Sequence, residues 1–159
     1  MKTLGRLLNC CSSTKINIVL PQMFESLEIS HVFPVPPNVI YESWLNEYEH
    51  SNMTGGLAHI EPFVGGKFDT WDGYIRGSNI ELVPHEKIIQ SWRTAHFPES
   101  APDSLLELNL ESIGDNTLLT LTHTNIPVDQ VEDCETGWIE YYFDPMLEYF
   151  GAENLIEDN

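Results

Sequence analysis

Three carboxylates near the C-terminus recur at intervals of four residues, at Glu140, Asp144 and Glu148. On a helix, this spacing places all three along one line of the surface. No lysine lies between them, so the carboxylates repel one another and cost some stability. Such a stripe is commonly a solvated helix face, but its uncompensated charge favours a docking surface for a basic partner. These three residues are therefore the predicted docking candidates.

Five aromatic residues could form the wall of a binding cavity. They occupy alternating positions in strand-like segments or helical positions near the C-terminus: Trp71, Tyr74, Trp92, Trp138 and Tyr142. Aromatic side chains at such positions most often belong to the hydrophobic core. If a sheet and a helix leave space between them, the same rings would instead enclose a small apolar ligand. The sequence leaves both interpretations open.

Motifs for catalysis or metal binding are missing from the sequence. The six histidines form no HExxH pattern, and no cysteine pairs with them at metal-binding spacing. There is no GxSxG elbow, and Gly65-Gly66 is expected to be a bend between strands rather than a phosphate-binding loop. We therefore predict no catalytic residue, no metal site and no cofactor.

Composition and charge limit the class of protein and its partners. A chain of 159 residues with 42% hydrophobic and 11% aromatic residues is sufficient for one domain with a substantial core. Its net charge of -18 would repel phosphate backbones and anionic lipids, so neither nucleic acid nor a membrane is an expected partner. No stretch is apolar enough to span a membrane. Beyond residue 22, Cys134 is the only cysteine, which suits a reducing compartment and predicts a cytoplasmic protein.

The charge is unevenly distributed, and this divides the chain into segments. Residues 1–22 contain Lys2, Arg6 and Lys15 but no acidic residue, and they lack the alternation of a strand. We expect them to form a disordered N-terminal appendage. Residues 23–152 are expected to form the domain, and residues 153–159 a short acidic tail.

Alternating patterns and short turns predict an antiparallel sheet. Residues 26–33 alternate apolar and polar side chains, which predicts a strand, and a short helix is predicted over residues 38–48 after Pro37. Further strands separated by short turns follow between residues 57 and 124, with a two-residue hairpin loop predicted at Gly77-Ser78. Together these segments predict about seven strands in one curved sheet with one apolar face.

The apolar face of this sheet needs a partner, which the C-terminal segment can provide. Residues 129–150 carry a broad apolar stripe at helical spacing, with Asp129 and Glu132 placed as a capping box. Pro145 lies inside the pattern and is expected to kink the helix. The prediction is an α+β fold in which a curved antiparallel sheet wraps around a long C-terminal helix.

Three stretches carry a resemblance to a known family: "GGKFDTWDGYIRGSNIELVPHEKIIQSWR" from residue 65, "NTLLTLTHTNIP" from residue 116 and "GWIEYYFDPMLEYFG" from residue 137. They resemble the C-terminal domain of the activator of the 90-kDa heat-shock protein ATPase, over about Leu27 to Gly151. The resemblance implies a START-like, pollen-allergen-like helix-grip fold. Residues 1–22 are too few for the separate N-terminal domain that makes much of the chaperone contact in the eukaryotic co-chaperone. ATPase stimulation is therefore not part of the expectation.

The resemblance orders the functions that the residues allow. It implies a co-chaperone-like interaction module that docks on a 90-kDa heat-shock protein. The alternative is binding of a small hydrophobic ligand in the cavity between the sheet and the C-terminal helix. A cyclase-like or hydratase-like enzyme, of the kind that the superfamily contains, is a third function that no motif in the sequence supports.

Overall fold

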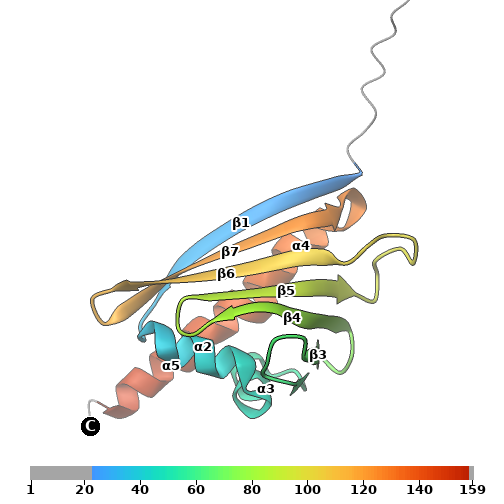
Figure 1. Ribbon diagram of the computed structural model, residues 1–159. Helices are drawn as coiled ribbons and strands as arrows, with labels where there is room; N and C mark the ends of the chain where they lie inside the picture. Colours follow the sequence, from blue (N-terminus) through green and yellow to red (C-terminus); the bar gives the residue numbers. More distant parts are fainter. Residues whose placement is uncertain (1–22, 158–159) are drawn as a thin grey trace, which may run out of the picture.

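The computed structural model describes residues 23–157, and Figure 1 shows how its helices and strands are arranged. The expected appendage, residues 1–22, lies outside the described residues. The elements are β1 Phe24–Phe33, α2 Pro37–Leu45, α3 Glu47–Thr54, β2 His59–Ile60, β3 Lys67–Thr70, β4 Ile75–Val83, β5 Lys87–Thr94, β6 Ser104–Ile113, β7 Asn116–Pro127, η1 Val128–Gln130, α4 Val131–Gly137, η2 Trp138–Phe143 and α5 Asp144–Glu157. Because α5 continues to Glu157, the segment expected to be an acidic tail begins as helix.

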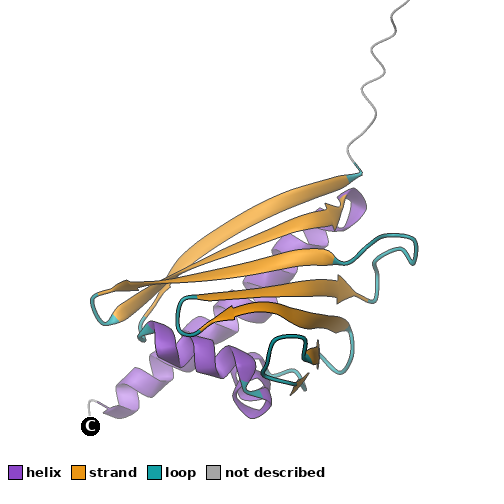
Figure 2. Ribbon diagram, in the orientation of Figure 1, coloured by secondary structure: helices purple, strands orange, loops and turns teal. Residues whose placement is uncertain are grey.

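Seven strands form one antiparallel sheet in the order β1-β7-β6-β5-β4-β3-β2. Strands β2 to β7 follow one another as a meander, and β1 completes the sheet by pairing with β7. The C-terminal helix runs diagonally across one face of the curved sheet (Figure 1), so that the molecule has a strand layer and a helix layer (Figure 2). The predicted α+β helix-grip fold is confirmed.

The hydrophobic core lies between these two layers. In β6 and β7 the buried leucines face each other across the register, with Leu108 opposite Leu121 and Leu110 opposite Leu119. The C-terminal helix contributes large side chains that are almost fully buried, among them Met146 and Phe150. The alternation along β6 and the helical spacing of the last segment predicted this arrangement, because each pattern leaves one apolar face that only the other can cover.

The two N-terminal helices are separate because Asn46 ends one and begins the other. The Asn46 side chain accepts hydrogen bonds from the backbone N–H groups of Tyr48 and Glu49, each at 3.0 Å, as an N-cap does. One helix over residues 38–48 was the expectation from the sequence, and it is wrong only at Asn46, where the chain leaves one helix and enters the next. The break lets α2 place Trp44 against the sheet while α3 carries the buried His50.

The hairpin predicted at Gly77-Ser78 is wrong, because both residues lie inside β4. The chain turns four residues earlier, between β3 and β4, where Trp71, Asp72 and Gly73 have φ values of 54, 55 and 82°. Gly77 serves a different purpose. A Cβ atom there would collide with the backbone carbonyl oxygen of Ser91 and with the ring of Phe68. Glycine is required at this position for close packing and not for a turn.

Gly77→Ala should therefore lower the free energy of unfolding by about 1–3 kcal/mol, the usual cost of overpacking a rigid site. Gly151→Ala is the matched control, since a Cβ at that helical position meets nothing within 4 Å. The control should gain up to about 1 kcal/mol from the better helix propensity of alanine. Urea denaturation of the two variants measures both effects, and a Gly77→Ala protein as stable as the parent would contradict the packing argument.

The C-terminal helix differs from the prediction at its start and at its centre. The expected capping box does not form, because a 3-10 turn over Val128–Gln130 precedes α4 and the N-cap residue, Gln130, makes no side-chain cap hydrogen bond. At the centre, the six residues Trp138–Phe143 form a π-helix that ends two residues before Pro145, and the Asp144 N–H that follows it bonds to the carbonyl of Ile139. Proline has no N–H to offer and its ring crowds the preceding turn, so the wider π segment accommodates the disturbance that Pro145 was expected to cause.

Candidate functional site

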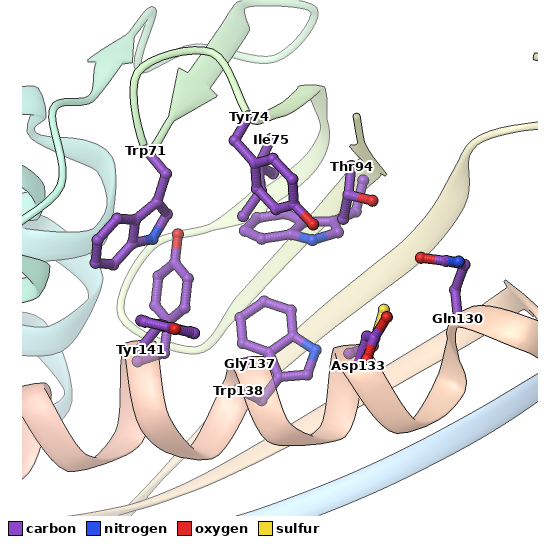
Figure 3. A pocket seen from close by; sticks show the side chains of 12 residues that line it. Trp71, Tyr74, Ile75, Thr94, Gln130, Asp133, Gly137, Trp138 and Tyr141 are labelled. Atoms are coloured by element: carbon purple, nitrogen blue, oxygen red, sulfur yellow. The ribbon is translucent and has the colours of Figure 1, made fainter. Parts of the chain in front are cut away.

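A pocket of about 360 Å³ lies between the C-terminal helix and the strand layer. Figure 3 shows Gln130, Asp133, Gly137, Trp138 and Tyr141 on the helix side, with Trp71, Tyr74, Ile75 and Thr94 opposite. All five predicted wall residues line this pocket: Trp71, Tyr74, Trp92, Trp138 and Tyr142. The sequence could not show that they converge, because they come from β5, the β3–β4 turn and the helix. Their positions agree with either of their predicted roles, since three of the rings are also core residues.

The β3–β4 turn holds Trp71 over one side of the pocket. One face of its indole ring contacts Gly56, where a Cβ atom would not fit, and the ring packs edge-on against Tyr141 with centroids 5.4 Å apart. The indole Nε1 is buried and has no hydrogen-bond partner. It lies near enough to the Tyr142 hydroxyl to affect that group's pKa, but it is not in hydrogen-bond geometry with it. Trp71 thus presents an unused donor beside the pocket.

A hydrogen-bond chain beneath the pocket fixes the helix to the sheet. The Trp138 Nε1–H donates to His123 Nδ1 at 3.0 Å, and His123 Nε2 lies 2.7 Å from Ser104 Oγ. The Ser104 hydroxyl in turn donates to the backbone carbonyl oxygen of Trp92. Because Nδ1 is an acceptor in this chain, the proton of a neutral His123 resides on Nε2. Burial lowers the pKa of His123 to about 4, so the ring is neutral at pH 7.

The direction of this chain excludes Ser104 and His123 as a nucleophile and its base. In such a pair the serine hydroxyl donates to a free imidazole nitrogen. Here His123 donates to Ser104, and the serine proton is already engaged by a carbonyl. Both residues are also fully buried beneath the aromatic wall. Their contacts support a structural function, the alignment of Trp138 with β5 and β7.

A second buried histidine organises the other end of the pocket. His50 Nδ1 donates to the carbonyl of Trp44 at 2.8 Å, which leaves Nε2 as the acceptor for the Tyr142 hydroxyl at 3.2 Å. The Thr70 hydroxyl lies 3.1 Å from the Tyr142 oxygen and can donate to it. Burial lowers the pKa of His50 to about 4 and raises the pKa of Tyr142, so both groups are neutral at pH 7.

Two titratable residues of the pocket lie on α4. Cys134 and Asp133 line the pocket, and burial together with the negative charge of Asp133 raises the pKa of the Cys134 thiol to about 11. A thiol with such a pKa is protonated at pH 7 and is a poor nucleophile. Within residues 23–157, no group of three or more His, Cys, Asp and Glu side chains is arranged to hold a metal ion.

The predicted docking residues Glu140, Asp144 and Glu148 are all exposed on the C-terminal helix. None of them lines the pocket, so the helix presents Trp138 and Tyr142 to the sheet and these three carboxylates to the outside. Two large side chains beside the stripe are exposed as well, Ile139 by 42% and Tyr141 by 53%. No Lys or Arg occurs between residues 128 and 159, so no basic side chain of the helix neutralises the stripe.

The comparisons with known proteins agree with this geometry. The family model for activator of Hsp90 ATPase homolog 1-like proteins matches residues 34–151. The chain belongs to this family. Among curated members, it is 27% identical over 125 residues to activator of 90 kDa heat shock protein ATPase homolog 1 from Homo sapiens. It is 29% identical over 119 residues to homolog 2 from Mus musculus. These matches cover 79% and 75% of the chain but only 37% and 36% of the two relatives.

A solved structure described as an HSP90 activator from Plasmodium falciparum is similar in both fold and sequence. It is 29% identical to this Hsp90-activator-like chain, with a TM-score of 0.74, and the match covers 79% of this chain and 96% of that one. A solved structure of Ara h 8.0201 shares the fold alone, with a TM-score of 0.66 at 12% identity, and the match covers 81% of this chain and 99% of that one. In this chain, no helix within residues 23–157 is long and apolar enough to cross a membrane.

Proposed function

We propose that this Hsp90-activator-like chain is a co-chaperone-like interaction module that docks on a 90-kDa heat-shock protein. The observation that carries the proposal is the similarity to the Plasmodium falciparum HSP90 activator, because it extends over 96% of that chain. The curated relatives are matched over little more than a third of their length, so ATPase stimulation by the whole relatives is not transferred to this chain. The proposal is therefore limited to docking.

The acidic stripe is the proposed contact with the chaperone. Glu140, Asp144 and Glu148 combine exposure, mutual repulsion and a lack of neutralising side chains on their helix. A basic patch on the partner would relieve this repulsion, and the net charge of -18 would accelerate the encounter. The exposed Ile139 and Tyr141 supply apolar area beside the charges, as the centre of a protein interface requires.

We also propose a cytoplasmic location. Its support is the free thiol of Cys134, the one cysteine in residues 23–157, together with the likeness to chaperone partners.

The ionic character of the proposed interface can be tested by varying the salt concentration, because contacts between exposed charges weaken as salt rises.

The triple variant Glu140→Gln, Asp144→Asn and Glu148→Gln should bind a purified 90-kDa heat-shock protein about tenfold more weakly at low salt. It should also show a flatter dependence of the dissociation constant on salt. The physical reason is that each neutralised carboxylate removes one screened attraction to the basic partner. Binding is measured by titration calorimetry with the full chain at several salt concentrations.

A matched control removes the same charge elsewhere. Glu25, Glu28 and Glu111 are exposed on the strand layer and none of them forms a salt bridge among the described residues. Their replacement by Gln removes the same three negative charges as the stripe variant. It should weaken binding to the chaperone much less. If both triple variants weaken binding alike, the chaperone responds to overall charge and the stripe is not the docking surface.

A further inference from the structure

A second hollow, of about 580 Å³, lies at the end of the sheet formed by β2, β3 and β4, and it shares no lining residue with the aromatic pocket. Its size is within the range of small-molecule sites. Charges of both signs line it: Lys67 and Arg76, together with Glu47, Glu61 and Asp69. Of the seven Lys and Arg residues of the chain, three precede residue 23, so half of the remaining four meet at this hollow. This concentration of cations in an acidic protein requires an explanation.

The two cations of the hollow have no carboxylate partner among residues 23–157. Asp69 lies directly opposite Arg76 in the register of β3 and β4, yet the two side chains form no salt bridge. Asp69 Oδ1 lies instead 3.3 Å from His59 Nδ1. The Arg76 Nε–H donates to the carbonyl of Gly73 at 3.3 Å, which holds the guanidinium beside the β3–β4 turn. The Nη groups of Arg76 and the ammonium of Lys67 are therefore available to bind an outside group.

Two carboxylates of the hollow are fixed by backbone groups. Glu47 Oε2 accepts the Ile60 N–H at 3.1 Å, and Glu61 Oε1 accepts the Lys67 N–H at 2.9 Å. Each bond occupies one carboxylate oxygen, and the second oxygen can accept from a ligand. Side chains that are already held in place lose little further freedom when a ligand binds, which favours affinity. The hollow thus combines fixed acceptors with unpaired donors.

The charges in and around the hollow restrict the class of ligand. An anion would meet the three carboxylates and the net charge of -18. A cation would meet Lys67 and Arg76, and Arg93 lies opposite Arg76 on β5 and adds a like charge. A molecule that carries one charge of each sign pairs with both sets of side chains, and it has no net charge for the field of the protein to repel.

We propose that this hollow binds a small zwitterion of the α-amino acid class. The carboxylate of the ligand pairs with Arg76 and Lys67, because the planar guanidinium fork matches the two oxygens of a carboxylate. The ammonium of the ligand pairs with Glu47 and Glu61. The site includes no residue of the proposed docking stripe and does not depend on chaperone binding.

Three probes that differ mainly in their charges test this assignment: L-leucine, N-acetyl-L-leucine and L-leucine methyl ester. The acetyl derivative lacks the ammonium charge, and the ester lacks the carboxylate charge. NMR titration of the full chain at physiological ionic strength follows the backbone amide signals of β2, β3 and β4. L-leucine should shift these signals saturably and bind about fivefold more tightly than either derivative, the effect of one exposed ion pair.

Variants of the two cations show whether the shifted signals report binding in the hollow. Arg76→Gln and Lys67→Gln should each weaken leucine binding about fivefold, because each removes one charge that faces the ligand. Lys87→Gln is the matched control, since Lys87 lies on β5, 4.0 Å from Glu107 in a salt bridge, and does not line the hollow. This control should bind leucine as the parent does.

Each outcome bears on the assignment. A preference for L-leucine over both derivatives that is lost in Arg76→Gln supports the site. The absence of a saturable shift with L-leucine up to its solubility overturns the proposal, as does equal or tighter binding of either derivative. Parental affinity of both Arg76→Gln and Lys67→Gln overturns it too, because leucine would then bind elsewhere. No chaperone is present in this assay, so its failure leaves the proposed docking function untouched.

Discussion

Trp138→Ala should lower the free energy of unfolding by about 3–5 kcal/mol. The side chain is only 3% exposed and lies at the centre of the aromatic group, with ring centroids 4.8 Å from Trp92 and 4.9 Å from Tyr142. Its removal leaves a cavity and deprives His123 Nδ1 of its donor. A domain of this size has a total stability of about 5–15 kcal/mol, so the loss is a large part of it. Urea denaturation at pH 7.5 measures the change.

Two further variants show which part of Trp138 matters. Trp138→Phe keeps a ring but loses the hydrogen bond to His123, and it should cost less than the alanine variant, about 1–3 kcal/mol. Ile139→Ala, at the next residue of the same helix, removes a side chain that is 42% exposed and should cost under about 1 kcal/mol. An unfolding midpoint of Trp138→Ala equal to that of the parent would mean that Trp138 is not part of the core.

Acidification from pH 6.5 to pH 4 should destabilise the protein through its two buried histidines. Burial lowers the pKa of both His50 and His123 from 6.5 to about 4. The unfolded chain therefore binds more protons than the folded one in this interval. The contribution of each histidine is complete above pH 6.5 and is lost as the pH falls toward 4. The full loss corresponds to about 3 kcal/mol for each residue.

Stability measured by urea denaturation at intervals between pH 7.5 and pH 4.5 tests this expectation. His50→Gln and His123→Gln should each lower stability at pH 7.5 and reduce the slope of stability against pH below 6.5, because one proton-binding group is removed. His31→Gln, at an exposed histidine of β1, is the control for the substitution itself and should change stability at pH 7.5 by under about 0.5 kcal/mol. If the variant that lacks both buried histidines keeps the parental slope, these rings are not its source.

The two-layer fold could be predicted from the sequence because its segments have strong periodicity. The buried leucines of β6, Leu106, Leu108 and Leu110, alternate strictly, and the C-terminal segment has an apolar stripe that no short turn interrupts. The prediction of local structure was wrong where the same residue type can be present for either of two physical reasons. Gly77 was predicted in a turn because glycine is common there, although it is present for close contact with Ser91 and Phe68. Only the tertiary structure distinguishes these two uses of glycine.

The site was predictable in its residue types but not in its hydrogen bonds. Both His31 and His123 occupy the apolar face of an alternating segment, yet His31 is exposed on the edge strand β1 and His123 is buried in β7. Strand order, which the alternation does not reveal, decides between them. His50 gave no signal, because α3 has no apolar periodicity of its own. The unpaired N–H of Trp71 likewise depends on a turn whose positive φ values no sequence pattern indicated.

Sedimentation velocity of the unmodified chain mixed with a purified 90-kDa heat-shock protein tests the proposed docking function most directly. At low salt, the chain should sediment with the chaperone, and the bound fraction should decrease as salt is raised toward 0.5 M, because the proposed contact pairs exposed charges, which ions at that concentration screen within roughly 5 Å. Sedimentation of the chain as a free species of 18.1 kDa at every salt concentration would contradict the account.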